Sequence, residues 1–138
     1  MRSLTVQFIP RDEFINERWS YKPGDHVTLI TPTQNGKTTL ACQLLEVTAH
    51  PGLQATMAVM KPRDPTPSEW TERLGFREVA DWPPSRWPWQ AKPPGYAHWP
   101  KHTFNVAADD EHLRDQFSRS LNDWYRKGDG IYFADEVQ

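Results

Sequence analysis

The sequence predicts an α/β fold, a parallel sheet flanked by helices, in a single domain over 1–138. Three observations favour it: a hydrophobic strand, a turn and a helix follow one another over 26–47, a second apolar strand comes at 55–60, and apolar residues at 131–134 form a last strand. Strand, helix and strand within about 35 residues make a βαβ unit, whose strands run parallel with a right-handed crossover. A chain of 138 residues can bury one hydrophobic core, and it is too short for two.

The first half of the chain alternates between strand and helix patterns. Residues 4–9 alternate apolar and polar, which predicts an edge strand, and residues 11–21 carry aromatic side chains at roughly helical spacing. Residues 26–30 are β-branched and aliphatic, so we expect a buried strand there. Residues 37–47 place leucines on one face and predict a helix.

The second half continues this alternation. Residues 55–60 predict a strand, 67–74 a short helix and 102–106 a further strand. Residues 109–126 predict a helix, because acidic residues open it and apolar side chains recur on one face. Residues 130–134 predict the last strand.

The segment 81–101 is rich in proline and tryptophan. Because proline lacks a backbone N–H, we expect neither a helix nor a central strand in it. We predict an ordered excursion over the surface, held by its aromatic side chains. Stacking of single-stranded nucleic acid on these rings is the alternative, and we disfavour it because the segment carries few cations. Its prolines and aromatic residues are Pro83, Pro84, Pro88, Pro93, Pro94, Pro100, Trp82, Trp87, Trp89, Tyr96 and Trp99.

Composition excludes several classes of protein. The net charge of −2 gives no global attraction to nucleic acid or to a membrane surface. The single cysteine, Cys42, allows no internal disulfide, which fits a reducing cytoplasm. The N-terminus lacks the apolar stretch of a signal peptide, and we expect no membrane segment.

The most specific motif is Gly36-Lys37-Thr38 at the start of the helix predicted over 37–47. Binding a triphosphate needs backbone N–H groups aimed at one anion, a long cation and a hydroxyl for Mg²⁺. Gly36 lets the backbone approach, Lys37 reaches the β- and γ-phosphates, and Thr38 ligates Mg²⁺. The cradle would be formed by the backbone amides of Thr33, Gln34, Asn35, Gly36, Lys37, Thr38 and Thr39.

The motif departs from the full phosphate-loop pattern at one position. That pattern, G-x-x-x-x-G-K-[ST], has a glycine where this chain has Thr31. The glycine eases the turn from strand to loop, and Pro32 offers another way of fixing that turn. A plain strand, turn and helix remains the alternative interpretation.

Two carboxylates follow the last predicted strand. Asp135 and Glu136 come directly after four apolar residues, and ligands of α/β proteins bind where strands end. Asp135 is placed to hold Mg²⁺ through water, and Glu136 to act as the general base toward the attacking water. Without the phosphate loop, they would be ordinary solvated charges.

Together these elements resemble the P-loop NTPases of the additional-strand, catalytic-glutamate class. Gly36-Lys37-Thr38 is similar to the Walker A element and 132–136 to the Walker B element. The phrases at 22–26 and 61–65 resemble FtsK/HerA-like ATPases of actinobacterial and phage genomes. The resemblance implies an ATP- and Mg²⁺-dependent motor that moves DNA, often as a ring of identical subunits. It also implies a further strand between those of Walker A and Walker B, which a chain ending at Gln138 would lack, so we expect a truncated product or one completed by a partner chain.

Three other functions stay open. One is a phage large-terminase-type packaging ATPase, which also tolerates the missing first glycine. The others are a nucleotide-binding module without hydrolysis and a remnant that only binds a partner. In any of the nucleotide-binding cases, Phe14 or Trp19 could stack on adenine, although core packing is the favoured role for both.

Overall fold

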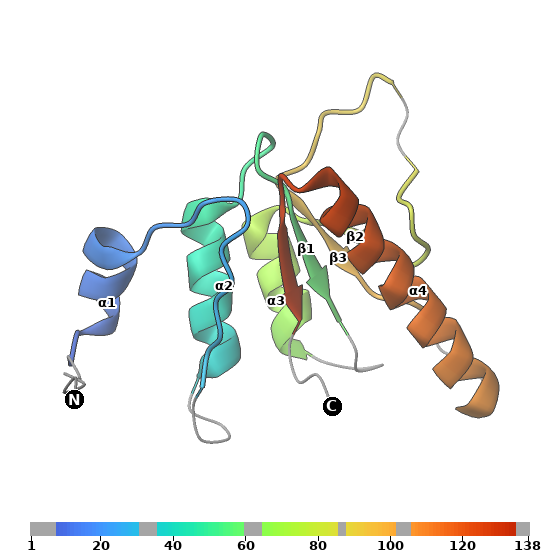
Figure 1. Cartoon of the computed structure of the whole chain (residues 1–138), viewed down its shortest axis with the longest axis horizontal. Helices are drawn as coiled ribbons and strands as arrows, with labels where there is room; N and C mark the ends of the chain where they lie inside the picture. The colour runs from blue at the N-terminus through green and yellow to red at the C-terminus, as the bar shows by residue number, and fades with distance from the viewer. Residues whose placement is uncertain (1–7, 31–35, 60–64, 86–87, 102–105, 135–138) are drawn as a thin grey trace, which may run out of the picture.

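The computed structural model of the chain describes residues 8–30, 36–59, 65–85, 88–101 and 106–134. Four short parallel strands form one sheet in the order β2-β3-β1-β4. Helices cover both faces of this sheet (Figure 1). The bounds of the elements are α1 Arg11–Glu13, continued by a π-helical turn Phe14–Arg18, then α2 Lys37–Thr48, β1 Ala55–Ala58, α3 Pro65–Leu74, β2 Arg77–Val79, β3 Gly95–His98, α4 Val106–Lys127 and β4 Ile131–Ala134.

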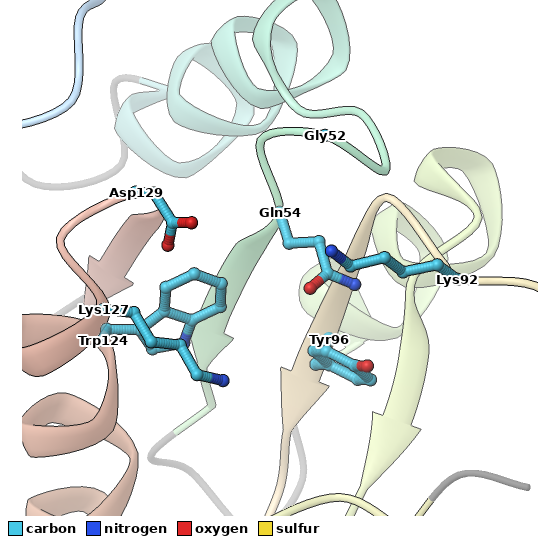
Figure 2. Close-up of a pocket in the computed structure, with 7 residues that line it drawn as sticks. All are labelled: Gly52, Gln54, Lys92, Tyr96, Trp124, Lys127 and Asp129. Atoms are coloured by element: carbon cyan, nitrogen blue, oxygen red, sulfur yellow. The ribbon is translucent and has the colours of Figure 1, made fainter. Parts of the chain in front are cut away.

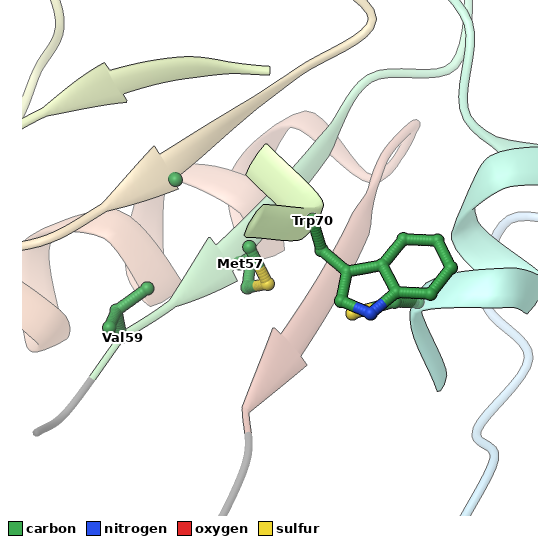
Figure 3. Packing of buried hydrophobic residues seen from close by; sticks show 5 residues of the cluster. Met57, Val59 and Trp70 are labelled. Carbon is green, nitrogen blue, oxygen red and sulfur yellow. The ribbon is translucent and has the colours of Figure 1, made fainter. Parts of the chain in front are cut away.

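Residues of β1 alternate between the two faces of the sheet. Met57 packs against Cys42 of α2 and Trp70 of α3, as Figure 3 shows in part. Thr56 points to the other face, where it accepts a hydrogen bond from Nε1 of Trp124 in α4. Because successive side chains of a strand point to opposite faces, both faces are covered and the strand is buried throughout.

The direction of the connections between strands explains which helices cover which face of the sheet. From β1 through α3 to β2 the chain moves one way across the sheet, and from β3 through α4 to β4 it moves the other way. Two right-handed crossovers in opposite directions must place their helices on opposite faces. Accordingly, α2 and α3 share one face and α4 covers the other.

Most of the predicted elements are confirmed. The helices expected at 37–47, 67–74 and 109–126 are α2, α3 and α4, and the strands expected at 55–60 and 130–134 are β1 and β4. The edge strand predicted at 4–9 lies mostly outside the described residues, as do 102–105 of the strand predicted at 102–106. Val106 itself opens α4.

The prediction that 81–101 contains no central strand is wrong. Gly95–His98 forms β3, which pairs with β2 on one side and β1 on the other. The strand fits between Pro94 and Pro100, and all four of its residues keep their backbone N–H. Pro94 contributes its carbonyl oxygen, which accepts from the Ala55 N–H at 3.1 Å. Gly95 is required, because a Cβ there would lie 2.6 Å from the carbonyl oxygen of Ala55.

The aromatic anchoring predicted for this segment is confirmed at Trp82. Its side chain is buried, its backbone N–H donates to Oε1 of Gln116 at 2.7 Å, and its indole N–H donates to Oδ2 of Asp123 at 3.2 Å. Trp89, by contrast, is 78% exposed.

Candidate functional site

The helix α2 begins with the predicted phosphate-binding residues. Gly36 precedes the helix with a positive φ of 77°, a conformation that glycine adopts without the steric cost of a Cβ. Its carbonyl oxygen accepts the first helical hydrogen bond, from the Leu40 N–H at 2.9 Å. Lys37 is the first helical residue, and Thr38 and Thr39 follow in the first turn.

The electrostatics at this helix end favour an anion. The first N–H groups of a helix have no partner within it, and they carry the positive end of the helix dipole. Gly36 has no side chain that could cap these N–H groups, and the first turn of α2 contains no acidic residue. Lys37 adds a full positive charge at the same place.

The N-terminus of α2 lies at the carboxyl edge of the sheet. In the middle of α2, Cys42 belongs to a buried cluster with Met57 and Val59, which lie late in β1 and just beyond it. Further along, Leu45 packs against Ala55 and Ile131, at the starts of β1 and β4. The helix therefore runs antiparallel to both strands, and α2 begins at the edge of the sheet where β4 ends (Figure 1).

Five of the predicted site residues lie outside the described residues. They are Thr33, Gln34 and Asn35 of the loop and the carboxylates Asp135 and Glu136. Among the residues that the structure does describe, no group of three or more His, Cys, Asp or Glu side chains could hold a metal ion. The described half of the site is thus Gly36 to Thr39.

The predicted buried strand at 26–30 is not formed. Val27 is 51% exposed and Ile30 is 89% exposed, and no strand is assigned to the segment. The segment runs alongside α2, towards the beginning of that helix (Figure 1). A β-branched sequence favours a strand only where a neighbouring strand offers backbone partners, and β4 is paired on one side with β1 and not with this segment.

A strand before α2 would be expected on the β4 side of the sheet. A right-handed connection over the face that α2 and α3 share runs from the β4 side towards β2. A strand at 26–30 that joined the sheet would therefore pair on the β4 side. The Tyr21 hydroxyl group agrees, because it donates to the carbonyl oxygen of Gly130, just before β4, at 3.3 Å.

Trp19 lies at the end of α2 that is remote from Gly36. Its indole N–H donates to Oγ1 of Thr48, the last residue of α2, at 2.7 Å. Its ring stacks on Tyr21 with centroids 6.5 Å apart, and Phe14 lies against it at 6.1 Å. This packing role is the one favoured from the sequence, and it leaves Trp19 a helix length away from the phosphate loop.

A pocket of about 450 Å³ opens at the opposite, amino edge of the sheet (Figure 2). None of the predicted phosphate-binding residues lines it. Ligands of parallel sheets bind at the carboxyl edge, so position favours the α2 site over this pocket. Its lining residues are Gly52, Gln54, Lys92, Tyr96, Trp124, Lys127 and Asp129.

The structure buries a histidine whose burial was not predicted from the sequence. His98 ends β3 with no exposed surface, and its Nδ1 lies 3.2 Å from Oγ of Ser120 in α4. That hydroxyl group also contacts the Tyr132 hydroxyl at 3.2 Å, whereas Nε2 of His98 has no hydrogen-bond partner among the described residues. Burial lowers the pKa of His98, which favours the neutral ring. The cluster lies on the α4 face, across the sheet from α2.

No protein-family model matches this chain, and no curated protein or solved structure is measurably similar to it. Among the described helices, none is both long enough and apolar enough to cross a lipid bilayer. What the chain does is therefore inferred from its own residues.

Proposed function

We propose that the chain binds Mg²⁺-ATP at the N-terminus of α2 and hydrolyses it, as ATPases that move DNA do. Lys37 binds the β- and γ-phosphates, and the backbone amides of Thr33 to Thr39 surround the phosphate chain. Thr38 and Asp135 offer the oxygen ligands that Mg²⁺ prefers, Asp135 through water. The metal would neutralise charge that develops on the phosphates.

The proposal rests on one observation: α2 begins, and β4 ends, at the same edge of the sheet. Gly36 and Lys37 lie at the carboxyl edge, and β4 ends at that edge one residue before Asp135. Lys37 and the end of β4 thus lie at one edge, and Asp135, which follows β4 in the sequence, is 98 residues from Lys37. A nucleotide there would have its phosphates at the helix and the carboxylates of 135 and 136 near its terminal phosphate.

Glu136 completes the proposed chemistry. A carboxylate near the γ-phosphate can orient a water molecule and accept its proton during attack on phosphorus, and ADP then leaves. The positive end of α2 and Lys37 stabilise the negative charge on the phosphates throughout.

A nucleotide-binding module without turnover is the second candidate. It is favoured by the exposed segment 26–30, which precedes the phosphate loop in the sequence and pairs with no described strand. Turnover needs the phosphates and the base to be held within a fraction of an ångström. In this view a further strand, supplied by a partner chain beside β4, would fix the loop and switch on hydrolysis. Assembly into a ring of identical subunits on DNA is part of the proposal that the chain is an ATPase that moves DNA.

Phosphate release from ATP, measured with and without Mg²⁺, tests the proposal. We expect Mg²⁺-dependent turnover that falls at least about 100-fold in Glu136→Gln, while nucleotide binding is kept. Lys37→Ala should lose both binding and turnover. Binding without turnover in the unaltered chain would favour the module, and turnover that is unaffected by Glu136→Gln would remove Glu136 from the chemistry.

A further inference from the structure

The guanidinium group of Arg11 lies against the phosphate-loop glycine. Arg11 opens α1, 25 residues before Gly36 in the sequence. A Cβ built on Gly36 would lie 3.4 Å from Nη2 of Arg11 and 3.7 Å from its Nη1. The packing of the N-terminal segment along α2 therefore brings a second cation to the place where the phosphates would bind.

This arrangement gathers positive charge at one point. The dipole of α2 ends there, Lys37 follows Gly36, and the first turn of α2 contains no acidic residue. None of the ion pairs between described residues includes Arg11. Arg18, later in the same N-terminal helical segment, is 3.7 Å from Glu13. An anion bound at this place would be attracted by Arg11, by Lys37 and by the positive end of α2 together.

We propose that Arg11 is a further phosphate-binding residue of this nucleotide site, supplied by the N-terminal segment of the same chain. The inference rests on the proposed function and adds to it the residue that recognises the triphosphate. A guanidinium group presents paired N–H donors that match two oxygens of a phosphate, and such charge-assisted hydrogen bonds are stronger than neutral ones. Since Arg11 is exposed and far from the core, it is available to bind a ligand.

Binding would also order the N-terminal segment. Arg11 reaches the phosphates from α1, whereas Trp19 already fixes the same segment to Thr48 at the far end of α2. A bound triphosphate would thus tie this segment to α2 at both ends.

Titration of the chain with Mg²⁺-ATP and with inorganic tripolyphosphate tests the inference. We expect Arg11→Ala to weaken both ligands about 10-fold or more, since a hydrogen bond to a charged group contributes about 1.5–3 kcal/mol. An equal loss for both ligands places the contact on phosphate and not on the base. Arg18→Ala, from the same helical segment, should bind as the unaltered chain does, and Arg11→Lys should recover part of the affinity.

The thermal midpoint without ligand separates a binding role from a structural one. Arg11→Ala should leave it unchanged, because the exposed Arg11 side chain lies outside the core. Unaltered binding in Arg11→Ala, with binding lost in Lys37→Ala, would overturn the role of Arg11 and leave the proposed function standing. Failure of the unaltered, folded chain to bind either ligand would overturn the proposed function itself.

Discussion

Gly130 lies directly against the indole ring of Trp124. A Cβ on Gly130 would be only 1.6 Å from Cζ3 of that ring and 2.0 Å from Cε3. The ring is held in place, because its Nε1–H donates to Oγ1 of Thr56 in β1. The turn between α4 and β4 is therefore fitted to a tryptophan that joins the helix to the middle of the sheet.

We predict that Gly130→Ala destabilises the protein by about 3 kcal/mol, because the added methyl group forces the ring from its site. Urea unfolding measures this change. Gly128→Ala is the matched control in the same turn. Gly128 has a φ of +67° and no atom within 4 Å of the added Cβ, so only backbone strain of about 1–2 kcal/mol is expected. Equal losses in the two variants would contradict the contact with Trp124.

Stability should fall as the pH drops below the ordinary histidine pKa of 6.5, because burial lowers the pKa of His98 in the folded protein. Between the lowered pKa and 6.5 the unfolded chain binds more protons, so acid favours unfolding and the stability is lost as pH falls through the folded pKa. Gln116 and Asp81 oppose the lowering, and His112 adds to it.

Unfolding free energies at pH 8 and pH 5 for the unaltered chain and for His98→Phe measure this effect. The variant keeps an aromatic ring beside Phe117 and Trp82 but cannot be protonated. Its stability should fall less between the two pH values. A fall of the same size in both proteins would assign the pH dependence to other groups.

Trp19→Phe should reduce stability by about 1 kcal/mol, the net contribution of a typical hydrogen bond, because it removes the bond to Thr48. It should leave the affinity for Mg²⁺-ATP unchanged, because Trp19 lies at the far end of α2. Thermal unfolding and nucleotide titration measure the two effects. A marked loss of affinity for ATP, with none for tripolyphosphate, would instead place Trp19 on the adenine ring.

The elements that local patterns determine were predictable. The amphipathic residues of α4 and the apolar runs of β1 and β4 specify helix or strand without knowledge of distant partners. The strand β3 was not predicted, because four suitable residues lie within a proline-rich segment and become a strand only between β1 and β2. The strand prediction for 26–30 was wrong for the opposite reason. Its sequence favours a strand, but no described strand pairs with it.

The candidate site was likewise predictable only where the relevant residues are adjacent in sequence. Gly36, Lys37 and Thr38 were predictable because the motif and the helix start are adjacent in sequence, and α2 begins at Lys37 as expected. Arg11 was not, since its contact with Gly36 depends on how the N-terminal segment packs along α2. The burial of His98 was not predicted, because it depends on the strand β3, which was not predicted either.

The most direct test of the nucleotide site is the thermal midpoint of this 138-residue chain with and without Mg²⁺-ATP, beside that of Lys37→Ala. A ligand that binds only the folded state must stabilise it, by about 2.7 kcal/mol at a ligand concentration 100 times Kd. We predict a rise in the unaltered chain that is absent in Lys37→Ala. No rise in a well-folded sample, or an equal rise in both proteins, would contradict a phosphate-binding site at the start of α2.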